Sequence, residues 1–208
     1  AGVSYSIPDG IWAQSRENII TVEKDNAGFA FFVSQNESVL IDMIKLLAKE
    51  HNINLNEKII TLYGEWAGGN IQKNSALSGS EKAFILFEHF KVSPIEPSED
   101  EKAIWYKTRY ISDIIEKETG QPIGKQYFWV CKPFKPNIYN IMSFDTYSFE
   151  IDFNAPDRGI NQIIELVDVI EEASPVGKAF GFEANIGEGV VCSYLTEDNS
   201  LIQFKVCF

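Results

Sequence analysis

The sequence is poor in cysteine and has no long apolar run. Its three cysteines are widely separated and form no C-x-x-C pair. We therefore expect reduced thiols at Cys131, Cys192 and Cys207 rather than a disulfide framework or a zinc site. No apolar run approaches the length of a membrane span, and the first residues show no basic segment followed by an apolar one. These absences predict a cytoplasmic protein without a transmembrane helix or a signal peptide.

Basic residues are also scarce. The chain has 18 Lys and Arg against 30 Asp and Glu, which gives a net charge of -12. Such a balance repels a phosphate backbone at long range and argues against a broad basic surface for nucleic acid. It leaves open an active site that gathers a few cations, or uses metal ions, to hold one nucleotide.

Apolar and aromatic side chains are abundant, at 45% and 13% of the 208 residues, which indicates one folded domain or one domain with a small appendage. Short apolar or alternating runs predict strands over residues 10–16, 59–63, 82–90, 128–131, 147–153 and 201–208, with another strand starting at Val190. Helical spacing predicts a helix over residues 103–118 and two further helices with apolar stripes, Val39, Leu40, Met43, Leu46 and Leu47 in one and Ile160, Ile163, Ile164, Val167 and Ile170 in the other. Candidate helix caps are Asp25 or Asn26 and Asn36 or Ser38. These elements predict an α+β fold.

A lone carboxylate follows the predicted strand 59–63. Glu65 stands where this strand runs into a loop that contains Gly68 and Gly69. A carboxylate at the end of a core strand, beside glycines that let a ligand approach the backbone, is suited to bind a hydroxyl group or a cation. The alternative is a hairpin turn with one solvated acid.

The segment around Glu65 resembles a motif of a known enzyme family. Residues 63–72, Tyr-Gly-Glu-Trp-Ala-Gly-Gly-Asn-Ile-Gln, are similar to Y-G-E-x-x-G-x-x-I-Q of the phage-type ATP-dependent RNA ligases, in the covalent nucleotidyltransferase superfamily. Further segments resemble other motifs of the family and occur in the same order as in the family. These segments are Ser15-Arg16, Phe87-Glu88, residues 174–181 with Lys178, Glu188-Gly189 and Lys205. The resemblance covers nearly the whole chain except residues 93–142, which are a candidate insertion that faces the substrate.

The resemblance implies a role for each residue of the nucleotide site. Arg16 would contact the nucleotide or its phosphates, for which the donor fork of a guanidinium is suited. Phe87 would stack on adenine with Glu88 beside it, Glu65 would hold the ribose, and Lys178 would contact a phosphate. Without the resemblance, Arg16 would be interpreted as part of a surface ion pair, and Phe87 as a core aromatic residue.

The C-terminal motifs supply the residues for phosphate chemistry. Glu188 matches the glutamate of an E-G-hydrophobic-V motif that coordinates a catalytic Mg²⁺ or Mn²⁺, and its flanking glycines would expose the carboxylate at the start of a strand. Lys205 matches the first lysine of a K-x-K motif. Cys207 stands where the second lysine is expected, and this difference puts part of the triphosphate chemistry in question. The alternative for Glu188 is an ordinary turn followed by a strand.

The family's activity implies a function for the chain. Such ligases form a lysyl-adenylate from ATP, transfer AMP to an RNA 5′-phosphate and join it to a 3′-hydroxyl end, as in RNA repair. The implied fold is one nucleotidyltransferase domain over residues 1–208, with antiparallel sheets, helices outside and a nucleotide cleft between the sheets. The nucleophilic lysine belongs to a K-x-D/H-G motif before Arg16, and residues 1–15 contain none.

Three interpretations remain open at this point. The lysine lies upstream of Ala1 in a complete ligase, or the chain is a non-catalytic nucleotide- or RNA-binding relative, or it is a structural domain with coincidental glycine turns. Lys24-Asp25-Asn26-Ala27-Gly28 resembles the missing motif superficially, but it follows Arg16 and is predicted to open a helix. We therefore do not assign Lys24 as the nucleophile.

Overall fold

The chain forms two compact units. The structure is a computed structural model, and it describes residues 1–16, 18–25, 27–71, 75–97, 101–131, 137–152, 154–182 and 185–207. The first unit comprises Ala1–Trp66 and Phe84–Asn140, and the second comprises Ala67–Ala83 and Ile141–Phe208. Helices and mainly antiparallel strands are both present, which confirms the α+β class. No helix in the described ranges is long and apolar enough to cross a membrane.

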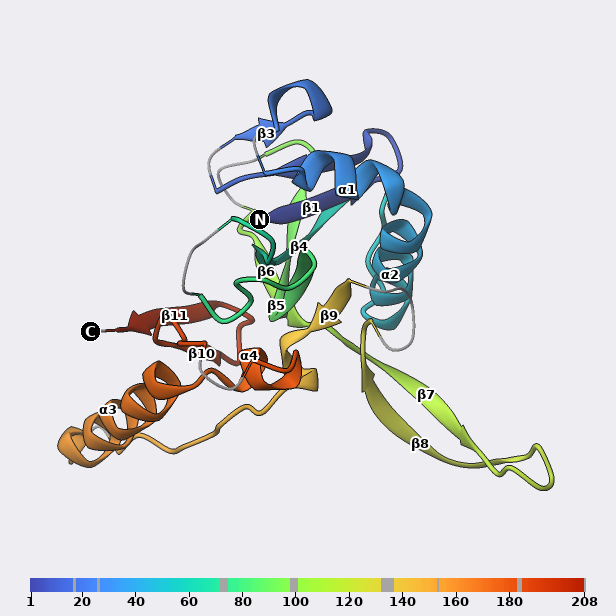
Figure 1. The fold of residues 1–208 in the computed structure, drawn as a ribbon. Helices are drawn as coiled ribbons and strands as arrows, with labels where there is room; N and C mark the ends of the chain where they lie inside the picture. Colours follow the sequence, from blue (N-terminus) through green and yellow to red (C-terminus); the bar gives the residue numbers. More distant parts are fainter. Residues whose placement is uncertain are drawn as a thin grey trace. The chain divides into compact units, whose positions relative to one another are not determined.

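A seven-stranded sheet forms the centre of the first unit (Figure 1). Its strands follow the order β3-β2-β1-β4-β5-β6, and β9 pairs with β5. The strands are β1 (Gly2–Ser6), β2 (Gly10–Gln14), β3 (Ile19–Ile20), β4 (Lys58–Ala67), β5 (Ala83–Pro94), β6 (Ile104–Lys107) and β9 (Ile138–Asn140). The β5–β9 pair is parallel, whereas β1 pairs antiparallel with both β2 and β4. The strands predicted at 10–16, 59–63 and 82–90 are thereby confirmed as β2, β4 and β5.

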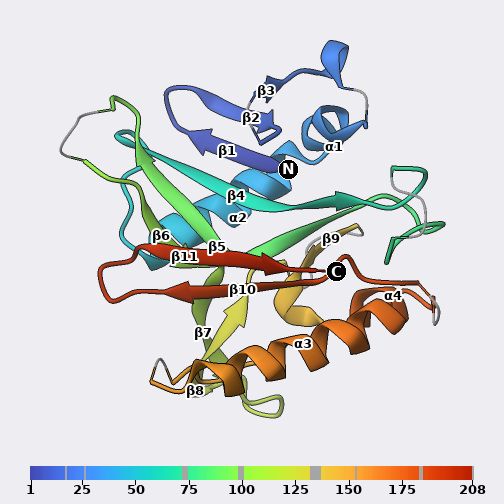
Figure 2. The ribbon, with the colours of Figure 1, turned by 90° about the vertical axis from the view of Figure 1, so that its left-hand side faces the viewer.

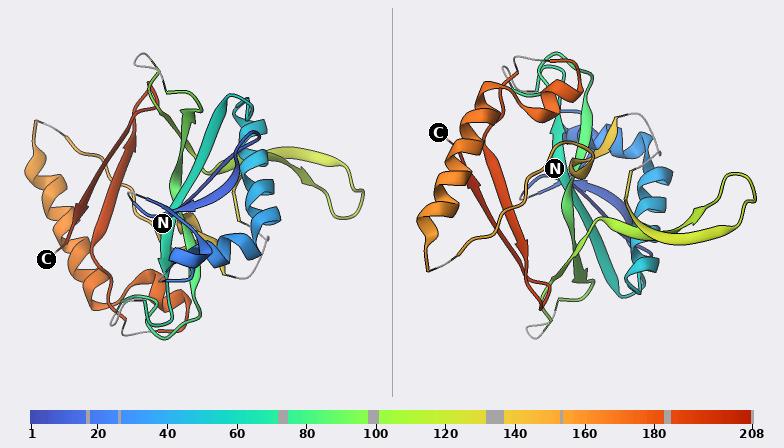
Figure 3. Two further views of the ribbon diagram at one scale, coloured as in Figure 1. Left: turned by 90° about the horizontal axis from the view of Figure 1, so that it is seen from above. Right: turned by 90° about the horizontal axis from the view of Figure 1, so that it is seen from below.

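Two helices, α1 (Phe29–Gln35) and α2 (Glu37–Glu50), cover one face of this sheet (Figure 3). Leu40, Met43 and Leu47 of the predicted stripe in α2 are fully buried. Phe29 of α1 contacts Trp66 and Phe84, with ring centroids 5.5 and 4.9 Å away. The stripe predicted between Val39 and Leu47 is therefore a core stripe, and aromatic packing attaches α1 to the sheet.

Asp25 caps α1, although it stands four residues before the first helical residue. It follows a short 3-10 helix, η1 (Val22–Lys24). Its carboxylate accepts hydrogen bonds from the backbone N–H groups of Gly28 and Phe31, at 3.0 and 3.2 Å, and also from that of Ala30. These donors have no partner within a helix, so the carboxylate satisfies them and also carries the charge that the N-terminus favours. Of the other cap candidates, Asn36 is the N-cap of α2 but makes no side-chain cap bond, and Asn26 lies outside the described residues.

Replacing Asp25 with alanine should destabilise the first unit. Loss of a capping side chain lowers the free energy of unfolding by about 1 to 2 kcal/mol. Urea unfolding of Asp25→Ala measures this loss. Asp42→Ala, which removes an exposed acid from α2, is the matched control and should leave the unfolding midpoint nearly unchanged.

Residues 103–118 were predicted to be a helix, and this prediction is wrong. They form β6 and β7 (Arg109–Ile115), and β7 pairs with β8 (Pro122–Trp129) in a hairpin that extends away from the sheet (Figure 1). The segment is rich in isoleucine and aromatic residues, which favour strands, and the pairing of β6 with β5 selects the extended form. The strand predicted at 128–131 matches only the end of β8.

The second unit packs a long helix against a hairpin (Figure 2). Its elements are η2 (Ile141–Ser143), α3 (Pro156–Glu172), α4 (Pro175–Ala179), β10 (Val190–Leu195) and β11 (Leu201–Val206). Both hairpin strands were predicted. The strand predicted at 147–153 is absent from residues 147–152, which form no regular element. Alternation alone does not form a strand, because the backbone groups also need a partner strand.

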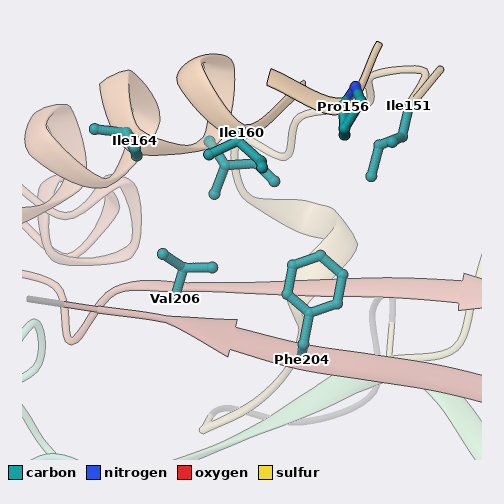
Figure 4. A pocket seen from close by; sticks show the side chains of 7 residues that line it. Ile151, Pro156, Ile160, Ile164, Phe204 and Val206 are labelled. Atoms are coloured by element: carbon teal, nitrogen blue, oxygen red, sulfur yellow. The ribbon is translucent and has the colours of Figure 1, made fainter. Parts of the chain in front are cut away.

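The predicted stripe of α3 is only partly buried. Ile163 and Val167 are buried, whereas Ile160 and Ile164 are 51% and 38% exposed. These two line an apolar pocket of about 310 Å³, across from Phe204 of β11 (Figure 4). Of the predicted motif and strands, Gln72, Phe153 and Phe208 lie outside the described residues.

Candidate functional site

Glu65 lies inside a strand. It was predicted at the junction of strand and loop, but β4 continues to Ala67. Its neighbour Trp66 packs against Phe29, so strand alternation directs Glu65 to the face of the sheet opposite α1 and α2. Glu65 is exposed there, whereas Trp66 is buried. A carboxylate on a strand is held more rigidly than one in a turn, which suits a positioned contact with a ligand.

Arg16 and Glu65 are brought together around Ala1. The α-amino group of Ala1 donates a hydrogen bond to the carbonyl oxygen of Gly64 at 2.8 Å. Burial lowers the pKa of this amino group, the negative charge of Glu65 opposes that shift, and the positive charge of Arg16 adds to it. Both side chains therefore lie within electrostatic range of the same point, at the start of β1. The structure thus gathers two of the predicted nucleotide contacts.

Phe87 and Glu88 differ in their surroundings. Phe87 is 38% exposed although it lies in the otherwise buried first half of β5, so part of its ring is accessible to a ligand. The Glu88 carboxylate lies 2.8 Å from the ammonium group of Lys107, and its other oxygen is 3.9 Å from Nδ1 of His89. Phe87 is thus partly exposed, its stacking role stays a prediction, and Glu88 is engaged in an ion pair within its own unit.

Lys107, His89 and Thr108 belong to this cluster and were not found from the sequence. Thr108 is fully buried, and its hydroxyl group contacts the carbonyl oxygens of Phe87 and Glu88 at 3.0 and 2.9 Å. These contacts fix the backbone of β5 at the Phe87 position. The antiparallel pairing of His89 with Lys107 was hidden because residues 103–118 were assigned to a helix.

The buried His89 predicts a dependence of stability on pH. Burial lowers its pKa, the charge of Glu88 opposes the shift, and that of Lys107 adds to it. Because the pKa in the folded state lies below the ordinary value near 6.5, the unfolded chain takes up the proton first as pH falls. The free energy of unfolding should therefore decrease as pH is lowered below about 6.5.

Urea unfolding between pH 7 and pH 5 tests this dependence. His89→Gln should reduce the pH slope, and a residual slope should remain because burial also lowers the pKa of His51. An unchanged slope in His89→Gln would contradict the assignment of the proton uptake to His89.

Two close backbone contacts hold Glu188 in the second unit. A Cβ at Gly187 would lie 2.3 Å from Cγ2 of Ile170, and a Cβ at Gly189 would lie 2.2 Å from the carbonyl oxygen of Val206. Gly189 also has a φ of +104°, which other residues rarely adopt. Glu188 is therefore fixed between the end of α3 and the end of β11, and its exposed side chain points to solvent. A solvated turn would not require such contacts.

Lys205 lies beside Glu188. Its ammonium group is 3.7 Å from a carboxylate oxygen of Glu188, and both side chains are about half exposed, at 48% and 53%. Cys207 is exposed as well, and its Cβ is 2.7 Å from the position that a Cβ of Gly189 would occupy. An ammonium group, a carboxylate and a free cysteine thus lie near the same end of the hairpin. All three cysteines of the chain are free.

Lys178 is exposed in the last turn of α4. The side chain of Ser174 caps this helix, and the backbone N–H of Ser174 donates to the carbonyl oxygen of Asn185 at 2.9 Å. Asn185 in turn donates to the carbonyl oxygens of Ala76 and Ser78. Within the described residues Lys178 forms no salt bridge, so its ammonium group is available to an anion.

The carboxylate of Glu188 fits one kind of metal site. The described part of the chain contains no group of three or more His, Cys, Asp or Glu residues that could hold a metal ion. A resident metal cage is therefore not formed by these residues. Mg²⁺ commonly keeps several waters and is bound by one or two carboxylates together with substrate phosphates. An exposed, fixed carboxylate beside a lysine suits this shared mode of binding.

Comparisons of this chain with protein-family models, with curated proteins and with solved structures found no match.

Proposed function

We propose that this chain is the adenylyltransferase part of an ATP-dependent RNA ligase, which activates RNA 5′-phosphate ends with AMP and joins them to 3′-hydroxyl ends. The observation that carries this proposal is the pair of Glu188 and Lys205. Two glycines that cannot accept a Cβ without displacing backbone or core atoms hold Glu188 in place, and Lys205 lies 3.7 Å from it. A metal-binding carboxylate and a phosphate-binding ammonium group are the two groups that a nucleoside triphosphate requires.

The second unit supplies groups for the phosphates. The ammonium group of Lys205 would bind a phosphate oxygen, and Lys178 offers a further cation. A divalent metal bound at Glu188 would neutralise charge on the triphosphate oxygens. Lys205 would release Glu188 when it binds phosphate, because their mutual attraction at half-exposed positions is weak.

The first unit supplies groups for the nucleoside. The exposed ring of Phe87 offers a flat surface for adenine, and the carboxylate of Glu65 is suited to accept hydrogen bonds from ribose hydroxyl groups. Arg16, which acts on the same point as Glu65, adds a guanidinium group for a phosphate.

The proposed first step is attack of a neutral lysine amine on the α-phosphorus of ATP. A phosphorus–nitrogen bond forms, the bond from the α-phosphorus to its bridging oxygen breaks, pyrophosphate leaves with the added negative charge, and the attacking nitrogen releases one proton to solvent. Lys205 would stabilise this charge as it develops, and neighbouring cations also favour the neutral form of the amine. In the RNA ligases the attacking lysine precedes the strand that ends in Ser-Arg, so we would look for it in the full-length protein upstream of Ser15-Arg16.

Incubation of the full-length protein with ATP labelled at the α-phosphate and Mg²⁺ tests this function. We expect a covalent protein-AMP adduct that shows the acid lability and alkali stability of a phosphorus–nitrogen bond and that transfers its AMP to an RNA with a 5′-phosphate. A protein that binds ATP and forms no adduct would contradict the ligase activity.

The second candidate is a non-catalytic nucleotide- or RNA-binding relative of the ligases. The observation that favours it is Cys207, which is exposed beside Gly189 where the ligases carry a second lysine. One cation fewer would weaken stabilisation of the leaving pyrophosphate more than it weakens binding of the nucleotide. The same adduct assay separates the two candidates.

A further inference from the structure

The face of the seven-stranded sheet opposite α1 and α2 is polar and aromatic. Ser4 of β1 pairs with Trp12 of β2 and with Thr61 of β4, and Gly2 pairs with Gln14 and Tyr63. Paired residues share a face, and their neighbours Val3 and Leu62 point into the core under the helices. This face therefore carries hydroxyl, amide and aromatic side chains in rows across three strands, with Ser4 and Thr61 buried and Trp12, Gln14 and Tyr63 partly exposed.

Two aromatic rings lie together on this face. The centroids of Tyr63 and Trp105 are 5.7 Å apart and their planes differ by 32°. Trp105 lies on β6 and Tyr63 on β4, so the two rings meet over β5, which separates their strands. Tyr63, Trp105 and Trp12 are each partly exposed. They thus present ring surface to solvent instead of filling the core.

A hydrogen-bond network holds the rings in position. The hydroxyl groups of Ser4 and Thr61 are 2.7 Å apart, and the hydroxyl group of Ser4 donates to the side chain of Gln14 at 3.0 Å. Burial raises the pKa of Tyr63, and hydrogen bonds with Gln14 and Thr61 oppose this shift. The Tyr63 ring is therefore anchored at its hydroxyl end, and little conformational entropy would be lost when a ligand stacks on it.

Cations accompany the rings. Lys91 of β5 is the cross-strand partner of Trp105, so its side chain emerges on the same face. Within the ranges that the structure describes, Lys91 forms no salt bridge. Arg16 follows the end of β2 and is exposed. In a chain with a net charge of -12, the ammonium group of Lys91 beside partly exposed rings matches the charge of a phosphate backbone, and Glu65 is the exposed carboxylate on the same face.

We infer that this face binds single-stranded RNA, with bases stacked on Tyr63, Trp105 and Trp12 and with a phosphate held by Lys91. Every base has a flat π-surface, so stacking on aromatic side chains tolerates any sequence. A duplex keeps its bases stacked on one another, which leaves none for these rings. The choice of RNA rests on the proposed ligase function, and the inference adds the surface along which the substrate strand lies.

Fluorescence anisotropy with a fluorescein-labelled 12-nucleotide oligouridylate tests this inference without ATP. Trp105→Leu should weaken binding about 5-fold to 150-fold, because one stacked base contributes on the order of 1 to 3 kcal/mol. Trp105→Phe keeps an aromatic ring and should retain most of the affinity. Tyr127→Leu removes an exposed aromatic residue from β8, away from this face, and is the matched control that should bind as the wild type does.

Lys91→Ala provides a second variant that removes no core packing, should Trp105→Leu fail to fold as judged by circular dichroism. It should weaken binding and reduce the slope of log affinity against log salt by about 0.7, the value for one lost contact with a single strand. Lys125→Ala, which removes an exposed lysine from β8, should leave RNA binding unchanged. A chain that binds RNA in this way but does not bind ATP would contradict the ligase proposal and support the inference of an RNA-binding face.

Three results would overturn the inference. The first is that Trp105→Leu or Lys91→Ala binds the oligouridylate with the same affinity as the wild type. The second is binding of a 12-base-pair duplex as tightly as of the single strand. The third is the absence of measurable affinity for the oligouridylate at low salt.

Discussion

Lys205→Ala is expected to lower the rate of protein-AMP formation by about 100-fold to 1,000-fold, the effect of removing one group that stabilises developing charge. Lys205 is half exposed on β11 and lies 3.7 Å from Glu188. Its ammonium group is therefore accessible to a phosphate and belongs to no buried network. As pyrophosphate leaves, negative charge increases on the oxygens that this ammonium group would contact.

The fold should not change in this variant. A half-exposed ion pair such as that of Lys205 and Glu188 contributes about 0 to 1 kcal/mol to stability. Quench-flow measurement of adduct formation in the full-length protein gives the rate, and thermal unfolding checks the fold. Lys125→Ala, which removes an exposed lysine from β8, is the matched control and should react at the wild-type rate. A wild-type rate in Lys205→Ala would refute its assignment to the phosphates.

Gly189→Ala is expected to destabilise the second unit severely. The added Cβ would lie 2.2 Å from the carbonyl oxygen of Val206, and the backbone φ of +104° is strained for alanine. Backbone strain of this kind costs about 1 to 3 kcal/mol, and overpacking costs a similar amount. The sum is a large part of the 5 to 15 kcal/mol, roughly, that stabilises a typical domain. The variant should therefore unfold at a much lower temperature, or the end of the β10–β11 hairpin next to Gly189 should no longer be ordered.

Gly181→Ala separates the two contributions. Gly181 has a φ of +86° and no atom within 4 Å of its added Cβ, so this variant bears only the backbone strain. Differential scanning calorimetry should show a markedly larger decrease in unfolding temperature for Gly189→Ala than for Gly181→Ala. Equal decreases would show that the contact with Val206 does not hold Glu188 in place.

Much of the first unit was predictable from its sequence. Strands β4 and β5 have short apolar runs, and α2 has an apolar stripe of Leu40, Met43 and Leu47 that only a helix places on one face. Local pattern and tertiary packing agree in these elements. The order of the short motifs also singled out Glu188 and Lys205, which the structure places 3.7 Å apart although 17 positions separate them in the chain.

The structural features that could not be predicted depend on contacts between residues that are distant in the sequence. Residues 104–107 become a strand because β5 offers its edge, whereas the alternating residues 147–152 have no strand to pair with in the described part of the chain. The ion pair of Glu88 with Lys107 follows from that edge pairing, so an incorrect helix concealed it. Glu65 was predicted at the end of a strand because Gly68 and Gly69 indicated a loop, yet β4 continues to Ala67. Gly64 stays in this strand, where a Cβ would clash with the carbonyl oxygen of Ile85.

Calorimetric titration of the 208-residue chain with ATP and with adenosine, both in the presence of Mg²⁺, tests most directly whether this chain binds an adenosine phosphate through the assigned groups. Phe87→Ala should lower the affinities for ATP and for adenosine by roughly the same factor, on the order of 5-fold to 150-fold, because it removes a contact with the base. Lys205→Ala should lower the affinity for ATP and leave the affinity for adenosine unchanged, because it removes a contact with a phosphate. Equal effects of Lys205→Ala on both ligands, or wild-type affinity for ATP in either variant, would contradict the assignment.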